Sequence, residues 1–209
     1  PSLGNPVDYL IVTRDMFIST LENFVAWKQS KGLVVAIETV ENIVSNFGGR
    51  DVPEKIWNYI RQYYQENSIK WVLLVGDADN DDGPPIGGTP TYSLDKNWEV
   101  PTRYVWNPDN GSDSNYTYMD ENYTPTDLYY AGLDNIWDAD ADNRFGESTL
   151  YSSQDEADWM AEVYVGRWPV RTVAELQEII RKTINFENSP ISSTNFLYLG
   201  AELGPSFEY

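Results

Sequence analysis

The sequence predicts an α/β fold with three layers, in which helices cover both faces of a mostly parallel sheet. Apolar, β-rich runs alternate along the chain with segments whose apolar residues recur at helical spacing. The run at residues 71–75 is apolar at every position, as expected for a central strand that is covered on both sides. Strands that alternate with helices favour a parallel sheet, because each helix carries the chain back across it.

Three strands and two helices are expected in the first part of the chain. The strands are the short apolar runs at residues 8–13, 34–37 and 71–75. The first helix follows the first strand and ends at Gly32, a residue type that often closes helices. The second helix begins at Asp51, because an acidic N-cap with Glu54 three residues later is a helix start signal. The third strand ends at Gly76, which places Asp77 at its carboxyl end.

A long loop separates these elements from those that follow. From about residue 78 to residue 126 the chain is rich in Asp, Asn, Gly, Pro, Ser and Tyr, and it is too long for a simple connector. We interpret it as an ordered, functional loop. Thr172 and Glu175 form a predicted capping box that opens a late helix. Further strands are expected at residues 127–131, 161–167 and 196–201. A single domain over residues 1–209 is the simplest organisation.

The composition excludes several classes of function. Fourteen Lys and Arg stand against 33 Asp and Glu, which gives a net charge of -19. A field of this sign repels nucleic acid and anionic lipid, so neither is an expected partner. No apolar run is long enough for a membrane span. The chain contains no cysteine and no histidine, which removes the nucleophilic thiol and the commonest general base.

An acidic turn at residues 138–147 is the sharpest local motif. Asp138, Asp140 and Asp142 occupy its first, third and fifth positions, a spacing at which carboxylates converge on Ca²⁺. Asn143 can adopt the left-handed conformation that Gly normally provides, and Glu147 can close the coordination shell. Glu147 stands earlier in this motif than the closing Glu does in an EF-hand loop, so we expect a related loop without flanking helices. The alternative is a solvated acidic turn.

A second calcium site is predicted at the end of the central strand. Asp77, Asp79 and Asp81 repeat the alternating spacing, although no late carboxylate follows them. Acidic residues also crowd the region from Asp120 to Glu162, where bound cations would relieve the repulsion.

Other chemistries receive less support from the sequence. The residues after the first strand contain no glycine, so a dinucleotide site is not expected. Acidic residues leave glycosidase chemistry open, but no pair stands out as acid and base. The aromatic residues of the long loop leave sugar stacking open.

Several segments, taken in order, resemble gingipain-like cysteine peptidases, which are relatives of the caspase fold. The resemblance covers nearly the whole chain, and its segments include residues 9–13, 73–77, 126–131, 137–147 and 161–167. It implies that residues 1–209 are the N-terminal portion of a caspase-like catalytic domain. It also implies a calcium-stabilised endopeptidase that is secreted or lies at the cell surface.

The resemblance assigns roles to residues inside and outside this chain. The catalytic histidine and cysteine would lie on a downstream segment or on a second chain after proteolytic processing, so this chain alone would not cleave a peptide or protein substrate. Asp158, four residues before Glu162, would line a specificity pocket for arginine. Arg167 is expected to be a structural ion-pair partner. A second interpretation is a calcium-dependent glycan- or protein-binding module, used for adhesion and without catalysis.

Overall fold

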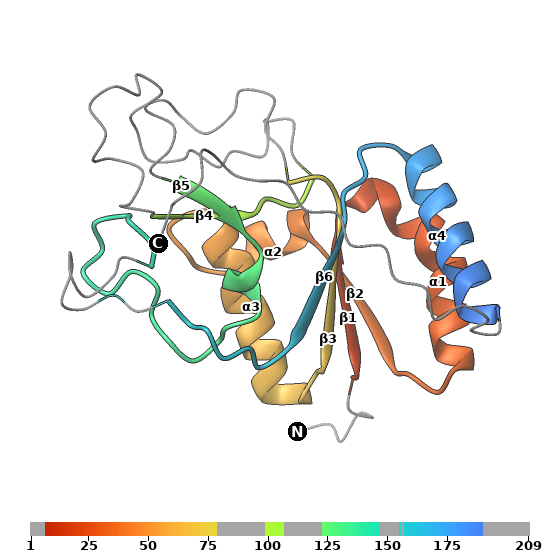
Figure 1. The fold of residues 1–209 in the computed structure, drawn as a ribbon, viewed down its shortest axis with the longest axis horizontal. Helices are drawn as coiled ribbons and strands as arrows, with labels where there is room; N and C mark the ends of the chain where they lie inside the picture. The colour runs from red at the N-terminus through yellow and green to blue at the C-terminus, as the bar shows by residue number, and fades with distance from the viewer. Residues whose placement is uncertain (1–6, 79–98, 107–122, 147–154, 156, 190–209) are drawn as a thin grey trace, which may run out of the picture.

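A four-stranded sheet forms the centre of the molecule. The computed structural model describes residues 7–78, 99–106, 123–146, 155 and 157–189. The sheet contains β1 (Tyr9–Thr13), β2 (Val35–Thr39), β3 (Trp71–Val75) and β6 (Tyr164–Trp168). Its order is β2-β1-β3-β6, and every neighbouring pair is parallel (Figure 1). The predicted α/β class with a mostly parallel sheet is therefore confirmed.

Helices cover both faces of this sheet, as the sequence predicts. One face carries α1 (Ile18–Ser30) and α4 (Val173–Asn188), which contact each other. The opposite face carries α2 (Val40–Asn46) and α3 (Val52–Asn67), which also contact each other (Figure 1). These faces are named below the α1/α4 side and the α2/α3 side. In the described residues, no helix is both long enough and apolar enough to cross a membrane.

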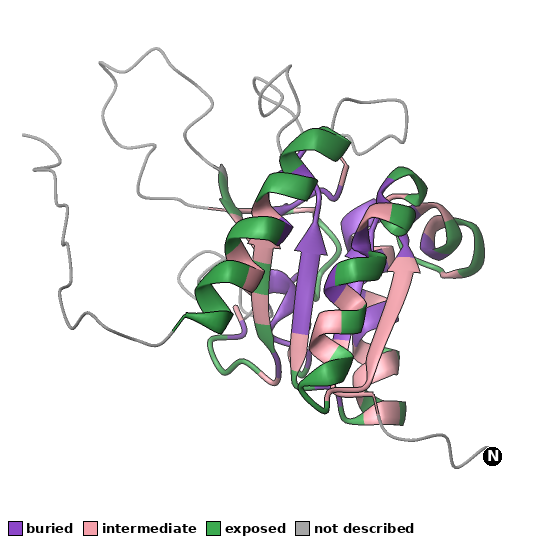
Figure 2. Cartoon of the chain, turned by 90° about the vertical axis from the view of Figure 1, so that its right-hand side faces the viewer, coloured by how far each residue is buried: buried purple, intermediate pink, exposed green. Residues whose placement is uncertain are grey.

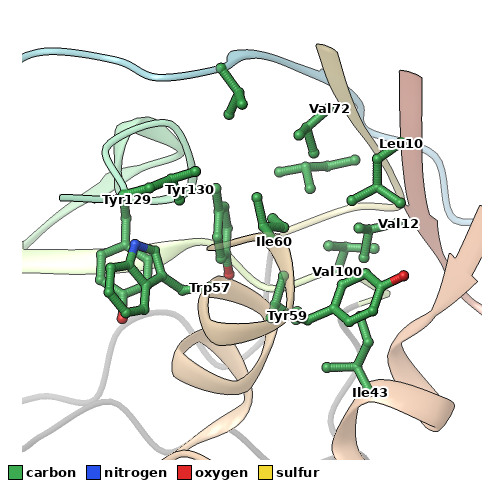
Figure 3. Close-up of a cluster of buried hydrophobic side chains, with 14 of the residues drawn as sticks. Leu10, Val12, Ile43, Trp57, Tyr59, Ile60, Val72, Val100, Tyr129 and Tyr130 are labelled. Atoms are coloured by element: carbon green, nitrogen blue, oxygen red, sulfur yellow. The ribbon is translucent and has the colours of Figure 1, made fainter. Parts of the chain in front are cut away.

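The central strands are buried on both faces. Alternate residues of a strand point to opposite sides, so Ile11 packs in the cluster on the α1/α4 side while Leu10 and Val12 pack in the cluster on the α2/α3 side. Figure 3 shows part of this second cluster, in which Trp57 and Tyr129 lie together. Figure 2 shows the contrast between a buried central strand and the edge strands, which are only partly buried.

The edge strand β6 exposes apolar surface. Within the described residues β3 is its one strand neighbour, and Tyr164 at its start is 74% exposed. A Cβ added at Gly166 would meet open space, so no described residue packs against the strand at this position. Trp159 and Met160, which lie just before the strand, are also exposed.

The helix starts agree with the predicted caps. The Asp51 carboxylate accepts a hydrogen bond from the Glu54 amide at 2.9 Å, which caps α3. Thr172 and Glu175 form the complete capping box of α4. Gly32 follows the end of α1 with a φ of +90°, a conformation that a side chain would disfavour.

Two predicted strands differ from the structure. Residues 127–131 do not form a strand, because the chain turns into the short 3-10 helix η4 (Leu128–Tyr130) directly after the strand β5 (Tyr123–Thr126). The Thr126 hydroxyl accepts from the Leu128 amide at 3.1 Å, and this contact starts the turn. β5 pairs antiparallel with β4 (Arg103–Trp106), so the predicted long loop contains a small second sheet.

The strand predicted at residues 161–167 begins later than expected, at Tyr164. The Glu162 amide instead donates to the Ala131 carbonyl, and the Glu162 carboxylate accepts from the Leu133 amide. Both contacts hold Glu162 against the segment after η4. The strand predicted at residues 196–201 lies outside the described residues.

Candidate metal centre

The acidic motif lies on the α2/α3 side of the molecule. Trp137 and Phe145 at its two ends are buried in the hydrophobic cluster of this side, and both pack edge-on against Tyr129. The Trp137 carbonyl also accepts a hydrogen bond from the Gly146 amide, which closes the base of the loop. We name residues 138–146 the acidic loop. Its ends are therefore anchored in the core; Asp138 is buried with them, while Asp140 and Asp142 are exposed.

Four carboxylates come together at this loop. One oxygen from each of Asp138, Asp140, Asp142 and Asp155 lies within 4.8 Å of the others. The three predicted aspartates are thus gathered as their spacing indicates. Asp155 joins them as a fourth donor that the sequence analysis missed, whereas Glu147 lies outside the described residues. Hard carboxylate oxygens in such a group suit Ca²⁺, so the side chains that are present fit this ion.

The backbone of the acidic loop holds this arrangement in place. The Asp138 carboxylate accepts from the amides of Asp142 and Asn143, each at 3.1 Å. Asn143 has a φ of +71°, which is the left-handed conformation predicted for it, and Ala141 has a φ of +63°. Short polar side chains that bond to nearby amides stabilise such turns. These hydrogen bonds therefore help to set the path of the loop.

Asp155 is the most unusual member of the group. It is 1% exposed, and one of its oxygens accepts from the Ala139 amide at 2.6 Å. Its Oδ2 atom is buried and has no donor among the residues that the structure describes. Burial raises the pKa of Asp155, and the charges of Asp138 and Asp140 raise it further against the effect of the Ala139 amide. A bound cation would satisfy this oxygen and offset the repulsion.

Arg50 already compensates part of the negative charge. Its guanidinium donates to Asp138 across 88 residues of sequence, and it also pairs with Glu54 at 2.9 Å. The same guanidinium lies over the Phe145 ring, 4.9 Å from its centre. A metal ion would therefore share Asp138 with a cation that the protein itself supplies.

The second predicted calcium site is only partly described. Asp77 lies at the carboxyl end of β3, as predicted, and its carboxylate accepts from Arg171. Asp79 and Asp81 lie outside the described residues. Asp77 is not among the acidic groups whose oxygens converge in the described part of the chain. The second site therefore stays a prediction.

Glu99 is a further acidic residue at this rim that the sequence analysis did not identify. Burial raises its pKa and the charge of Asp77 adds to the effect, while Arg171 and Arg14 act in the opposite direction. The amides of Glu99 and Val100 both donate to the Asp77 carbonyl. A Cβ added at Gly76 would lie 2.6 Å from the Cβ of Glu99, so the two segments are in close contact.

Asp158 is buried and bonded to the backbone. It is 3% exposed, and its carboxylate accepts from the amides of Asp134, Asn135 and Met160 at 3.1, 3.3 and 3.1 Å. Gly132 packs so closely that an added Cβ would lie 2.6 Å from the Cβ of Asp158. In the described structure this carboxylate therefore fixes the segment after η4. The predicted specificity role stays a prediction.

Arg167 has the structural role expected from the sequence. Its guanidinium forms two hydrogen bonds to the Asp127 carboxylate, each at 2.7 Å. It also donates to the carbonyls of Gly76 and Val100, at 2.8 and 2.6 Å. It thus joins the end of β3, the segment before β4 and the start of η4.

Comparisons with known proteins agree with this architecture. The sequence matches the model of Peptidase family C25 over residues 2–206. A dimeric latent PorU from Porphyromonas gingivalis has a TM-score of 0.56 at 19% identity, and the match covers 86% of this chain and 15% of that chain. A complex of the pro- and mature domains of RgpB from Porphyromonas gingivalis has a TM-score of 0.51 at 18% identity, and the match covers 86% of this chain and 29% of that chain. No curated protein sequence gives a significant match.

At these identities the two solved structures show a shared fold and nothing finer. The chain spans less than a third of either protein. The family model, in contrast, covers almost every residue of the sequence. The chain therefore belongs to peptidase family C25.

Proposed function

We propose that this chain is the non-catalytic large fragment of a gingipain-like cysteine endopeptidase. The observation that carries the proposal is the family match over residues 2–206. The fragment is non-catalytic in this proposal because its sequence contains neither cysteine nor histidine. A cysteine peptidase needs a thiolate nucleophile and a nearby base. In this proposal a following segment or a second chain, separated by proteolytic processing, supplies both groups. Residues 1–209 contribute the metal site and part of the substrate pocket.

Calcium has a structural role in this proposal. Asp138, Asp140, Asp142 and Asp155 would hold the ion, with Glu147 as a further candidate ligand. The bound ion would supply positive charge that offsets the repulsion between these carboxylates. The four-carboxylate group and the unsatisfied Oδ2 atom of Asp155 support this assignment. The second site at Asp77, Asp79 and Asp81 is part of the same proposal.

Asp158 would contribute to recognition of an arginine side chain. A carboxylate has about four lone-pair sites, and three backbone amides use three of them in the described structure. The remaining capacity and the negative charge are suited to one contact from a substrate guanidinium. Asp158 follows the metal ligand Asp155 by three residues, so the calcium site would help to hold the pocket wall in place.

Peptide hydrolysis by two proteins tests the proposal. The chain of 209 residues is compared with a longer polypeptide that contains it together with the segment that follows. Each is incubated with fluorogenic peptides that end in Arg or in Lys before the scissile bond. We expect no hydrolysis by the short chain, and hydrolysis by the long one that a thiol-alkylating reagent abolishes. Thiol-independent hydrolysis by the short chain would contradict the proposal.

A substitution in the longer polypeptide tests the pocket separately. We expect Asp158→Asn to reduce kcat/KM for the Arg peptide by about tenfold or more, because a charged hydrogen bond is lost. The exposed neighbour Asp134 provides the matched control Asp134→Asn, which should leave cleavage unchanged. If Asp158→Asn retains its melting temperature and its preference for Arg, the pocket assignment is wrong and the peptidase proposal still stands.

We also propose that the protein acts outside the cell or at its surface. Calcium is plentiful there, and a loop with several carboxylates needs a steady supply of the ion. Fractionation of the producing cells, followed by mass spectrometry of peptides from this chain, tests the compartment. Recovery only from the cytosol would contradict it.

A calcium-dependent binding module is the second candidate function. The observation in its favour is the exposed apolar surface of Trp159, Met160 and Tyr164, which lies close in sequence to Asp155 and Asp158. Contiguous exposed apolar residues often mark binding surfaces. A screen of glycans and protein ligands, with Ca²⁺ and with a chelator, distinguishes this function from proteolysis.

A further inference from the structure

The edge strand β6 begins beside a group of exposed apolar side chains. Trp159 and Met160 are 77% and 78% exposed just before the strand, and Tyr164, its first residue, is 74% exposed. Ile136, on the segment after η4, is 65% exposed. Single exposed apolar residues are common, whereas a group of large ones in one place marks an interaction surface. We name these four residues the β6-edge surface.

Hydrogen bonds hold the two segments of this surface side by side. The Asp158 carboxylate accepts from the Met160 amide on its own segment and from the Asn135 amide on the other, at 3.1 and 3.3 Å. The segment that carries Ile136 therefore lies against the segment that carries Trp159 and leads into β6. The exposed apolar side chains thus come from adjoining parts of the fold.

The edge of β6 continues this surface. In the described part of the chain β3 is its one strand neighbour, and the Tyr164 amide donates toward β3, to the Lys70 carbonyl at 2.8 Å. Backbone groups of successive strand residues point to opposite edges, so those of Val165 and Arg167 point away from β3. An edge of this kind is a template for another polypeptide.

The last described helix ends close to this surface. Glu187, in the last turn of α4, accepts from Lys28 at 2.6 Å, and Lys28 lies over the ring of Tyr9 at the start of β1. Tyr9 pairs with Trp71, and Trp71 pairs with Tyr164. The end of α4 and the start of β6 therefore lie at the same end of the sheet (Figure 1). A polypeptide that continues from α4 begins at the end of the sheet that carries the β6-edge surface.

We propose that the β6-edge surface docks the part of the same polypeptide that carries the catalytic histidine and cysteine, an inference that rests on the proposed function. In that function Asp158 holds a substrate arginine while the thiolate attacks the peptide bond of the same residue. The dyad has to stand within the length of one arginine side chain from Asp158. Because the Asp158 carboxylate is bonded to both segments of the surface, the dyad-bearing part has to lie against them.

Two other occupants fit these observations less well. A second copy of the chain carries the same charge of -19, and the exposed Asp134 on this surface adds to the repulsion between copies. A glycan stacks on aromatic rings and forms hydrogen bonds, whereas Met160 and Ile136 offer neither a ring nor a donor. A polypeptide with apolar side chains matches all four residues.

Methionine oxidation measures the exposure of this surface directly. The chain of 209 residues and a longer polypeptide that includes the following segment are treated briefly with hydrogen peroxide in the presence of Ca²⁺. Mass spectrometry of their peptides follows sulfoxide formation at each methionine. We expect Met160 to oxidise about tenfold more slowly in the longer polypeptide, because reaction requires an accessible sulfur. Met16, which is 52% exposed at the opposite end of the sheet, should oxidise equally in both.

Two variants of the longer polypeptide show whether this surface causes the protection. Trp159→Ser removes a large apolar contact, so Met160 should oxidise at close to its rate in the short chain. Met16→Ser should leave Met160 protected. Both replaced side chains are exposed, so the same substitutions in the short chain should leave its melting temperature unchanged. Full protection of Met160 in the Trp159→Ser variant would overturn the proposal.

The same measurement separates this proposal from the peptidase function. Equal oxidation of Met160 in both proteins, with hydrolysis of the Arg peptide by the longer one, would overturn the docking surface and leave the peptidase function intact. Protection of Met160 in a longer polypeptide that hydrolyses no peptide would support the docking surface and contradict the peptidase function. Protection that grows with the concentration of the short chain would show a second copy on the surface and overturn the proposal.

Discussion

The two sides of the sheet differ in what they bury. The α1/α4 side buries a cluster of apolar residues that includes Ile11, Phe24 and Leu176. The α2/α3 side buries a larger cluster and also polar groups, among them Arg103, Asp138 and Asp155. Among the described residues, Asp155 Oδ2 and Trp137 Nε1 on this second side are buried and have no hydrogen-bond partner. In the described residues, one side therefore buries a purely apolar cluster, while the other combines an apolar cluster with buried polar groups.

The largest expected effect tests the apolar side. Phe24 is 1% exposed and packs against Trp168, with ring centres 4.6 Å apart. Phe24→Ala should lower the free energy of unfolding by about 3–5 kcal/mol, as for other buried aromatic residues. Urea unfolding measures this loss, which should be the same with and without Ca²⁺. Phe186→Ala on α4 is the control, because Phe186 is exposed and should change stability by less than about 0.5 kcal/mol.

A comparable loss is expected from one buried ion pair on the α2/α3 side. Arg103 is 2% exposed and forms two hydrogen bonds to Asp51, at 2.7 and 2.8 Å. Asp51→Asn keeps an oxygen that can cap α3 but removes the charge that balances Arg103. We expect a loss of about 3 kcal/mol in urea unfolding, as for other broken buried pairs. A loss no larger than that of the surface control Arg181→Gln would show that Arg103 does not need this partner.

Calcium should stabilise the α2/α3 side by an intermediate amount. At a Ca²⁺ concentration one hundred times the Kd, linkage predicts a gain of about 2.7 kcal/mol in the free energy of unfolding. Scanning calorimetry of the chain with Ca²⁺ and with Mg²⁺ measures the gain and its selectivity. Asp140→Asn should reduce the response to Ca²⁺, because Asp140 belongs to the four-carboxylate group.

The control for Asp140→Asn is a substitution of Glu178, an acidic residue on the exposed surface of α4. Glu178→Gln should leave the response to Ca²⁺ intact. An equal response in the Asp140→Asn and Glu178→Gln variants would contradict a site at the acidic loop.

The smallest expected effect is a dependence on pH that belongs to the α1/α4 side. Glu187 of α4 accepts from Trp27 and Lys28 of α1, at 2.8 and 2.6 Å. Burial opposes ionisation, but these hydrogen bonds hold the pKa of Glu187 below its ordinary value. Its stabilising contribution is therefore present above the unfolded pKa of about 4.3 and is lost as the pH falls through the folded value.

Glu187→Gln measures this contribution. It should lower stability by about 0.2–1 kcal/mol at neutral pH, as for other partly exposed ion pairs. The difference between the variant and the unmodified chain should shrink when urea unfolding is repeated at about pH 3. A difference that is equal at both pH values would show that the charge of Glu187 is not the cause.

Local patterns predict the fold well, because its main determinants lie close together in sequence. Asp51 and Thr172 each cap a helix by accepting a hydrogen bond from the amide three residues later. The apolar run at residues 71–75 lies in the middle of the sheet, as its composition indicates. The prediction of a strand at residues 127–131 was wrong because aromatic residues favour strands. In the structure Tyr129 and Tyr130 are buried from the short helix η4 instead, so the same apolar residues reach the core without a strand.

The candidate site was only partly predictable, because some of its residues lie far apart in the sequence. The spacing of Asp138, Asp140 and Asp142 indicates a loop that converges on one point. Asp155 reaches the same point through the folded path of the chain, which no spacing rule describes. Arg50 meets Asp138 across 88 residues of sequence.

The close contact at Gly76 has a consequence for where this protein keeps its ligands. In doubly wound sheets the gap above the strands where the connections diverge is the usual binding crevice. Here the chain leaves β1 toward β2 on one side of the sheet and leaves β3 toward β6 on the other side. The gap therefore lies beyond the carboxyl ends of the neighbouring strands β1 and β3. Residues 99–100 pack onto Gly76 at this point, and Val100 is wholly buried. Residues 99–100 thus cover the end of β3 beside this crevice, and Gly76→Leu would push them away from it.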